Sequence, residues 1–222
     1  MTDRLSEKNA PAVQYDQPGP TKGERTRTRI LDVAYDSIVH KGFAATSIEE
    51  LVEAAGITKS GFFYHFKDKS DLARQLIETY TARNARFLDD MTRRARDLSD
   101  DPLHSFLIFL KLYAERMEEQ TEGHPGCMVA TVTFQDLVWD QATRQLVIDM
   151  VLEWRAWFVA WLEEIAETYP PKGKASLEDL ADAILAYTYG GMTLVRALGD
   201  TGAIARQTLI FRETVRLYFL GA

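Results

Sequence analysis

Three short helical segments, separated only by tight turns, occupy residues 24–66 and constrain the fold of this chain more than any other feature. The first runs from Glu24 to Lys41, with apolar residues at helical spacing, and Gly42 follows where a helix commonly stops. The second ends at Gly56, and the third covers Lys59 to about His65. Helices shorter than about 12 residues are marginal by themselves. The three segments are therefore expected to share one core.

Hydroxyl residues precede the second and third segments, which is typical of capped helix starts. Ser47, with Glu50 three residues later, predicts a capping box, and Thr58 predicts a second cap. The third segment is expected to pack through Phe62, Phe63 or Phe66. Two short helices joined by a glycine turn predict a helix-turn-helix unit.

Beyond residue 68 the pattern changes to longer helices, separated by segments rich in proline, glycine and aspartate. β-Branched residues recur at spacings of three and four and not in alternation, so we predict an all-α fold. We expect a flexible tail over 1–23, a helix-turn-helix domain over 24–68 and a larger helical domain over 69–222. The expected long helices are Lys69–Arg96, Pro102–Glu122, Cys127–Val138, Gln141–Tyr169, Leu177–Leu198 and Ile204–Leu220.

The charge distribution gives only weak support for a nucleic-acid partner. The whole chain of 222 residues carries a net charge of −7, whereas residues 22–69 hold 8 basic and 7 acidic residues. The uncharged stretch from Ala183 to Val195 is well short of the roughly 20 residues that span a bilayer. No secretory signal is evident, and the single cysteine, Cys127, excludes an intrachain disulfide. We expect a cytoplasmic protein with no membrane partner.

The start of the third segment has the composition of a surface that approaches DNA. Thr58-Lys59-Ser60-Gly61 offers hydroxyls, one cation and a residue without a side chain, which allows the backbone to come close to the major groove. Tyr64, His65, Lys67 and Lys69 offer donors at the far end, suited to phosphates. Motif and spacing, more than charge, therefore favour DNA binding.

The stretch from Arg27 to Leu76 closely resembles the DNA-binding domain of the TetR/AcrR family of bacterial transcriptional regulators. The resemblance is carried by Lys41-Gly42-Phe43, Thr46-Ser47-Ile48, Ala54-Ala55-Gly56-Ile57 and Phe63-Tyr64-His65-Phe66-Lys67-Asp68-Lys69. It implies a regulator, as a rule a repressor, that binds a palindromic operator in double-stranded DNA as a homodimer and is released by a small-molecule effector.

The resemblance and the composition together define a set of candidate DNA-binding residues. Alternatives remain for some of them: Phe62 either touches a thymine methyl or packs, Tyr64 and His65 either contact phosphate or pack in the turn, and Lys59 is either a contact or a solvated lysine. The set comprises Arg25, Arg27, Thr46, Ser47, Thr58, Lys59, Ser60, Gly61, Phe62, Tyr64, His65, Lys67 and Lys69.

In this family the C-terminal helices usually enclose a ligand cavity, and the last two helices pair in the dimer. Aromatic and methionine residues between 106 and 158 would suit an apolar or aromatic effector, with ordinary core packing as the alternative for each. The candidate ligand-binding residues are Phe109, Tyr113, Met117, Cys127, Met128, Thr131, Phe134, Trp154, Trp157, Phe158 and Tyr187. The expected dimer surface includes Ala186, Gly190, Gly191, Leu209, Phe211, Val215 and Tyr218, although the glycine pair could instead mark a bend.

Other classes of protein have less support. Cys127 at a helix start could be a redox or electrophile sensor, or simply a small buried residue. Its pairing with His124 suggests a thiol enzyme, but no third catalytic partner is evident. His40, His65, His104 and His124 include no pair at a spacing of four, so no metal site is predicted. We expect neither catalysis nor a cofactor, and a helical adaptor is the remaining alternative.

Overall fold

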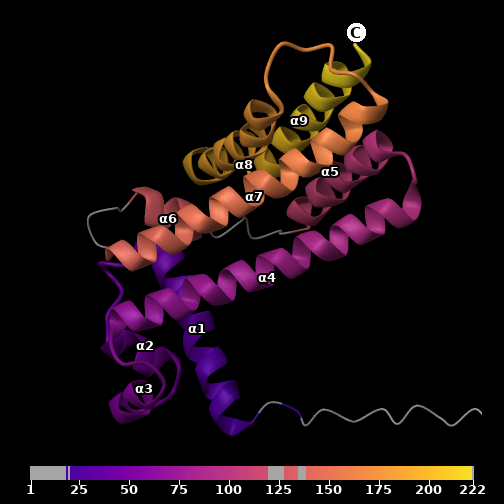
Figure 1. The fold of residues 1–222 in the computed structure, drawn as a ribbon. Coiled ribbons are helices and arrows are strands. Elements are labelled where there is room, and N and C mark those ends of the chain that lie inside the picture. Colours follow the sequence, from indigo (N-terminus) through magenta and orange to yellow (C-terminus); the bar gives the residue numbers. More distant parts are fainter. Residues whose placement is uncertain (1–18, 20, 120–127, 135–138, 222) are drawn as a thin grey trace, which may run out of the picture.

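The computed structural model describes residues 19, 21–119, 128–134 and 139–221. Every regular element in these ranges is a helix, which confirms the predicted all-α class (Figure 1). No helix within them has the length and apolar character needed to cross a bilayer. The helices are α1 (Lys22–Lys41), α2 (Ile48–Ala54), α3 (Lys59–His65), α4 (Lys69–Leu98), α5 (Pro102–Glu118), α6 (Met128–Phe134), α7 (Gln141–Thr168), α8 (Leu177–Leu198) and α9 (Ala203–Leu220).

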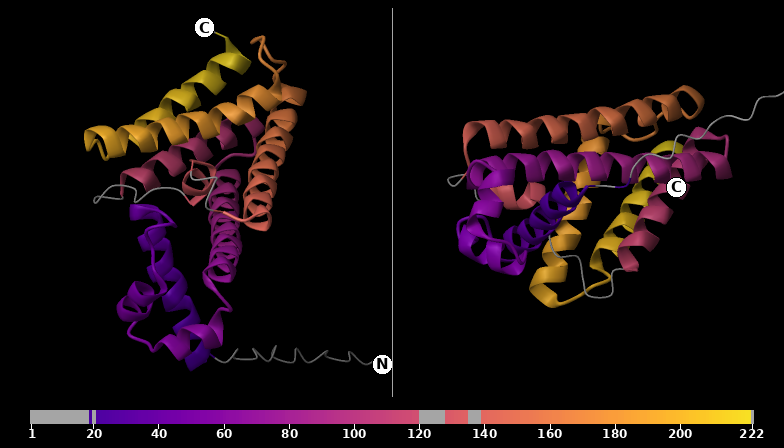
Figure 2. Two further views of the ribbon diagram at one scale, coloured as in Figure 1. Left: turned by 90° about the vertical axis from the view of Figure 1, so that its left-hand side faces the viewer. Right: turned by 90° about the horizontal axis from the view of Figure 1, so that it is seen from below.

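Helices α1 to α3 form a separate module at one end of the molecule (Figure 2). Ile38, Leu51, Phe62 and Phe66 meet in its core and are each at most 1% exposed. Gly56 turns the chain between α2 and α3 with φ of +60°, a conformation that glycine adopts without strain. Two helices of 7 residues thus acquire, by sharing this core, a stability that neither has alone.

The larger helical part is built on α4, which runs from the three-helix module along the whole underside of α5 and α7 (Figure 1). Helix α9 packs against both α5 and α8, and its residues Phe211, Val215 and Phe219 are buried there. Phe106 and Trp161 stack edge-on at 5.0 Å between ring centroids, in a core shared by α5 and α7. This core holds the helices at fixed positions around a cavity described below.

Several contacts join the module to the larger part. Arg83 of α4 pairs with Asp32 of α1 at 2.8 Å, and the rings of Phe43 and Trp139 stack with centroids 4.2 Å apart. Arg196 of α8 donates to the backbone carbonyl of Val39, at 3.2 Å, near the end of α1. The orientation of α1 is therefore set by α4 and α8 as well as by its own module.

The predicted helix limits agree closely with the structure where local signals mark them. Helices α3 and α8 have the predicted bounds, and α5 ends at Glu118, earlier than predicted. The predicted capping box at Ser47 forms only in part: its hydroxyl accepts from the Glu50 backbone at 3.2 Å, but the Glu50 carboxylate pairs with Lys41. Thr58 caps α3 as predicted.

Candidate DNA interface and ligand cavity

Helix α3 presents one polar face to solvent and buries the other. The Thr58 hydroxyl accepts a hydrogen bond from the Gly61 backbone at 3.1 Å and lies 3.0 Å from the Ser60 hydroxyl. Thr58, Lys59 and Ser60 are exposed, while Phe62 on the opposite face is 0% exposed. A Cβ atom at Gly61 would lie 3.3 Å from the Thr58 hydroxyl, so a larger residue would crowd this start. The first turn of α3 is thus a small, polar, outward-facing surface.

Two of the predicted DNA contacts, Thr46 and Phe62, have buried side chains, which favours the alternatives to them. Thr46 is 1% exposed, and its hydroxyl donates to the Gly42 carbonyl at 3.0 Å with the Ser37 hydroxyl also 3.0 Å away. Phe62 packs against Phe66 in the module core, so the packing alternative holds for it. Ser47 is exposed at the start of α2, where its hydroxyl already accepts from the backbone.

Past the first turn of α3, two aromatic side chains remain accessible. Tyr64 is 83% exposed, and its ring meets that of His65 edge-on, with centroids 4.9 Å apart. His65 is half-buried. Phe63 is 47% exposed, although it was a candidate for core packing. The packing alternative therefore does not apply to Tyr64, whose hydroxyl is placed where it can reach a partner outside the chain.

Several basic side chains of the module already contact other groups of the chain. Lys59 pairs with Glu49 at 2.7 Å, and this hydrogen bond holds the pKa of that carboxyl below its usual range. Arg27 donates to the Gln75 side-chain oxygen, and its guanidinium lies over the Phe66 ring. Lys69 is half-buried: its ammonium donates to the Phe43 carbonyl at 2.5 Å.

Burial of the ammonium lowers the pKa of Lys69, and repulsion from the charge of Lys41 lowers it further. The ammonium also lies 4.2 Å from the centroid of the Phe43 ring. Lys69 thus has a structural role in joining α4 to the turn after α1. Lys67 and Arg25, in contrast, are exposed at the surface of the module. The predicted basic residues are therefore not equivalent, and Lys67 is better placed than Lys69 to meet a phosphate.

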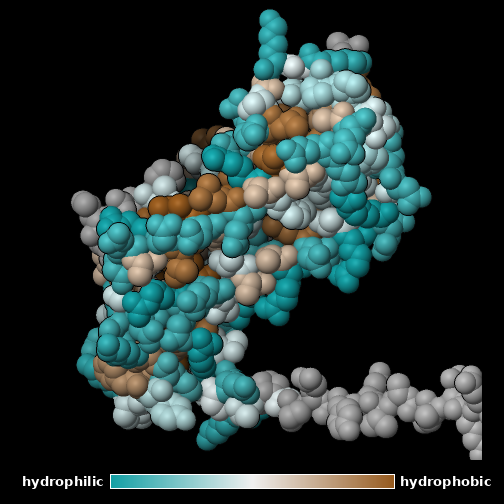
Figure 3. Space-filling view, viewed as in Figure 1, coloured by the Kyte–Doolittle hydropathy of each residue, from teal (hydrophilic) through white to brown (hydrophobic). Residues whose placement is uncertain are grey.

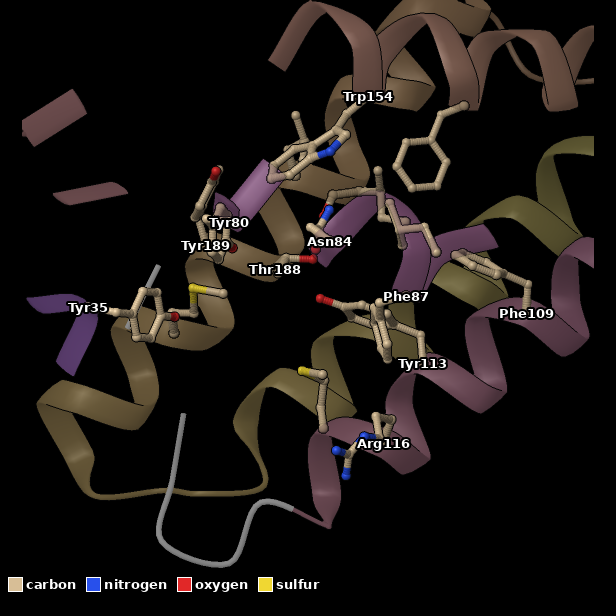
Figure 4. A pocket seen from close by; sticks show the side chains of 16 residues that line it. Tyr35, Tyr80, Asn84, Phe87, Phe109, Tyr113, Arg116, Trp154, Thr188 and Tyr189 are labelled. Atoms are coloured by element: carbon tan, nitrogen blue, oxygen red, sulfur yellow. The ribbon is translucent and has the colours of Figure 1, made fainter. Parts of the chain in front are cut away.

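A cavity of about 270 Å³ lies between α4, α5, α7 and α8, and Tyr35 of α1 also lines it (Figure 4). Its wall is predominantly aromatic, with single polar groups from Asn84 and Thr188. Five of the predicted ligand-binding residues line it: Phe109, Tyr113, Met117, Trp154 and Phe158.

Other predicted ligand residues lie elsewhere. Met128 is buried in the core next to the three-helix module, and Trp157 packs on Phe158 with ring centroids 4.6 Å apart. Tyr187 packs on Phe211 at 5.6 Å, on the α9 side of α8. Thr131 is half-buried in α6 and is absent from the wall. Cys127 and the side chain of Phe134 lie outside the described residues, as does His124.

Sequence reasoning missed the part of the wall that comes from α1, α4 and α8, together with Arg116 of α5. On α4 the missed residues recur at helical spacing, in the order Tyr-x-x-x-Asn-x-x-Phe-Leu. This pattern is a signal in the sequence that could have identified the α4 part of the wall. The missed residues are Tyr35, Tyr80, Asn84, Phe87, Leu88, Arg116, Ile184, Leu185, Thr188, Tyr189 and Met192.

The outer face of α8 and α9 is apolar, but some of the residues that we predicted for it are buried. Phe211 and Val215 are at most 1% exposed and face their own domain. The exposed apolar residues of α9 are Leu209, Ile210, Leu217 and Leu220. Gly191 lies against Ile204 and serves close packing of α8 on α9, whereas Gly190 faces open space.

A second apolar patch lies on α7. Ile148 and Leu152 are each 49% exposed there, and brown side chains gather along this helix in Figure 3. The three-helix module in the same view is mostly teal. The apolar surface of the described chain is thus concentrated on the larger domain.

The described chain thus combines a helix-turn-helix module with a larger helical domain that borders a cavity. Residues 30–76 match the family described as bacterial regulatory proteins, tetR family. This match covers the module from within α1 to the first part of α4, and over this part the chain resembles the family. The chain is similar to the transcriptional regulator AcrR of Shigella flexneri, with 42% identity over 57 residues, which are 26% of this chain and 26% of that protein.

Two further similarities extend beyond the first three helices. The transcriptional repressor KstR2 of Rhodococcus jostii is 28% identical over 112 residues, which are 50% of each chain. The crystal structure of a TetR-family regulator from Agrobacterium tumefaciens superposes with a TM-score of 0.74 at 21% identity, covering 87% of this chain and 98% of that one. The matched segments thus span a quarter to a half of these curated relatives. These relatives are named as transcriptional regulators.

Proposed function

We propose that this protein is a transcriptional repressor that binds a palindromic operator as a homodimer and releases it when a small molecule occupies the cavity. The observation that carries the proposal is the outward-facing first turn of α3, where Thr58, Lys59 and Ser60 are exposed on a helix anchored by the buried Phe62. A short, firmly anchored helix with a polar outer face is what insertion into a major groove requires.

We assign base contacts to the start of α3 and phosphate contacts to its surroundings. Gly61 leaves room for the DNA backbone or a base edge to approach, and the exposed Tyr64 hydroxyl is placed for a phosphate. The remaining assigned contacts are Arg25, Arg27, Ser47, His65, Lys67 and Lys69, of which Arg27 and Lys69 would first have to give up internal partners. We keep 24–68 as the DNA-binding domain and 69–222 as the ligand-binding and dimerisation domain.

We assign dimerisation to the outer face of α8 and α9. Ala186, Gly190, Thr193 and Ala197 form an exposed stripe of small side chains along α8, at spacings of four, three and four. On α9, Ile210, Leu217 and Leu220 are exposed at helical spacing. A face of small residues beside an apolar one allows two helices to pack closely on a second copy.

Release by a ligand follows from where the cavity lies. Its wall includes side chains of α4, the helix that continues directly from the DNA-binding module. A ligand that binds better to one orientation of α4 changes the separation of two recognition helices in a dimer, and so weakens operator binding by its differential affinity. Repression lifted by a ligand is the simplest outcome of this arrangement.

The test is selection of duplexes by the full chain from a random pool, followed by footprinting on the promoter next to its own gene. We expect an inverted repeat whose half-sites are about one DNA turn apart. Ser60→Ala should change the preferred sequence, because its hydroxyl is placed at the bases. A chain that selects no sequence above background would contradict the proposal.

A separate measurement addresses the dimer. Ile210→Glu should convert the protein to a monomer in light scattering, because it places a charge on the apolar face of α9. Ile148→Glu on α7 is the matched control, with the same change at an equally exposed isoleucine, and it should leave the dimer intact. Loss of the dimer in the control variant alone would move the interface to α7.

A further inference from the structure

The cavity wall has a feature that the proposed function does not require: one of its residues belongs to the DNA-binding module itself. Tyr35 of α1 lines the cavity together with Tyr80 and Asn84 of α4 and Tyr189 of α8. Its ring stacks on that of Tyr80, with centroids 5.9 Å apart and planes within 16° of parallel. Figure 4 shows Tyr35 at one side of the cavity and Phe109 at the opposite side.

A second hollow adjoins the cavity at this stack. It has about 260 Å³ and shares Tyr35, Tyr80, Asn84 and Phe87 with the first. The stacked tyrosines therefore line two neighbouring spaces at the junction of α1 and α4. A planar ligand has room beside them, and any ligand that fills the end of the cavity near α1 touches Tyr35.

The charges around the cavity are already compensated. In the part of the chain that the structure describes, no Asp or Glu lines either hollow, and the lining cations are Arg116 and Arg83. Arg116 pairs with Glu119 at 2.9 Å, and Arg83 pairs with Asp32 at 2.8 Å. A ligand charge placed between the aromatic walls would have no free partner and would lose its hydration, which is unfavourable. The cavity thus favours an uncharged ligand.

The polar groups of the wall specify hydrogen bonding. Asn84, Thr188 and Tyr113 point toward the same space in Figure 4. The Thr188 hydroxyl already donates to the Ile184 carbonyl, at 2.8 Å, and can still accept. Within the described residues, the side-chain amide of Asn84 has no hydrogen-bond partner, although this group can both donate and accept. A hydroxyl or carbonyl on the ligand would satisfy it.

We propose that the ligand is an uncharged planar aromatic molecule with a hydroxyl or carbonyl group, and that it contacts the DNA-binding module directly through Tyr35. The aromatic walls bind the ring faces, Asn84 binds the polar group, and Tyr35 senses occupancy from α1. The regulatory role of Tyr35 rests on the proposed function, whereas the binding site is argued from the cavity alone. Tyr35 is then a positioning residue for α1 as well as a ligand contact.

The test is calorimetric titration of the full chain with 2-naphthol and with 2-naphthoate, which share a ring and differ in charge at pH 7. We expect 2-naphthol to bind at least tenfold more tightly. Asn84→Leu should weaken 2-naphthol about fivefold or more. Equal or tighter binding of 2-naphthoate would overturn the charge assignment, and failure of both probes to bind at millimolar concentration would overturn the proposal.

The contact with α1 has its own matched variants. Tyr35→Ala should weaken 2-naphthol at least fivefold, Tyr35→Phe should retain binding because it keeps the ring, and Asp36→Ala, at the exposed neighbouring position of α1, should change it less than twofold. Wild-type affinity in Tyr35→Ala would overturn the contact. If Tyr35→Ala does not fold, the test uses the change in tyrosine absorbance that ligand addition causes. This change should be lost in Tyr35→Phe, and an unaltered change would contradict the contact.

Regulation is read on a duplex that the protein itself selects. Saturating 2-naphthol should lower the affinity of the wild type for this duplex at least threefold and that of Tyr35→Ala less. An equal reduction in both would overturn the sensing role of Tyr35. A chain that selects no duplex would contradict the proposed function, whereas the calorimetric result would still decide the ligand class.

Discussion

At the scale of single residues, the two lysines that flank the start of α4 have different surroundings although the sequence makes them look alike. Lys67 is exposed, and its backbone N–H donates to the Asp71 carboxylate at 3.0 Å. Lys69 directs its ammonium inward to the Phe43 carbonyl. Because an ammonium that already donates to the backbone is less able to meet a phosphate, we expect Lys67 to make the stronger phosphate contact of the two.

Lys67→Ala should weaken operator binding by similar factors on all sequences and reduce the slope of log K against log salt by about 1 per subunit. Lys69→Met should instead lower the free energy of unfolding by about 1 kcal/mol, since it removes an internal hydrogen bond. Salt titrations of DNA binding and urea unfolding of both variants check this. A larger change of salt slope in Lys69→Met than in Lys67→Ala would reverse the assignment.

Asp101 is a second residue with more than one partner. Its carboxylate accepts from the His104 backbone at 2.8 Å, which caps α5, and from the Tyr169 hydroxyl at 2.5 Å. Burial raises the pKa of this carboxyl, but the hydrogen bonds from Tyr169 and His104 outweigh it, and the net pKa is lowered. The hydrogen bond between Tyr169 and Asp101 also raises the pKa of Tyr169. The charged carboxylate thus joins the start of α5 to the end of α7.

We expect Asp101→Ala to destabilise the protein by about 1 to 2 kcal/mol at pH 7, the usual loss for a helix cap together with one hydrogen bond. A carboxyl with a lowered pKa stabilises the fold above its unfolded pKa, and this contribution is lost as the pH falls through the folded pKa. The difference from wild type should therefore shrink below about pH 4. Thermal unfolding from pH 7 to pH 3 measures it, and a difference that grows toward acid would contradict the role.

At the scale of helices, the adjacent glycines of α8 face in different directions. A Cβ atom at Gly191 would lie 2.8 Å from the Ile204 Cα atom, so α8 and α9 meet backbone to backbone there. At Gly190 a Cβ atom would have nothing within 4 Å in the same chain. One glycine is therefore required by the fold of the chain, and the other is free for a partner.

Gly191→Ala should destabilise the protein by about 1 to 3 kcal/mol, since the α9 backbone must shift to admit a methyl group. Gly190→Ala should be neutral or stabilising by up to about 1 kcal/mol, because alanine favours the helix. Thermal unfolding of the two variants, one residue apart, provides the comparison. Equal destabilisation by both would show that the outer face is packed as tightly as the inner one.

The helices themselves were largely predictable from the sequence, because their ends depend on local signals. Thr58 and Gly56 mark the limits of α2 and α3 by capping and turn geometry alone. The choice between Phe62 and Phe63 as the buried residue depends on how α3 packs, which no local pattern specifies. The contribution of Tyr35 to the cavity depends on how two domains meet, and for that reason the sequence did not predict it.

At the scale of the whole molecule, the larger domain holds the end of α1 through Arg196. Its guanidinium donates to the carbonyls of Val39 and His40, at 3.2 and 3.4 Å, which are among the last carbonyls of the helix and lack partners within it. On the same helix, Met192 and Tyr189 line the cavity about one and two turns before Arg196. A ligand that shifts α8 therefore acts on α1 at a second point, about one helical turn after Tyr35.

We expect Arg196→Gln to loosen the end of α1 and to lower the affinity of the ligand-free protein for its operator about threefold to tenfold, because the recognition helices are then less fixed in orientation. Faster amide hydrogen exchange should be confined to the last turn of α1 and its surroundings. Arg93→Gln is the matched control, since Arg93 pairs with Asp90 on the surface of α4 at 2.6 Å and touches no other domain. Exchange and operator affinity that change equally in both variants would mean that Arg196 is only another surface arginine, and that α8 does not hold the DNA-binding module in place.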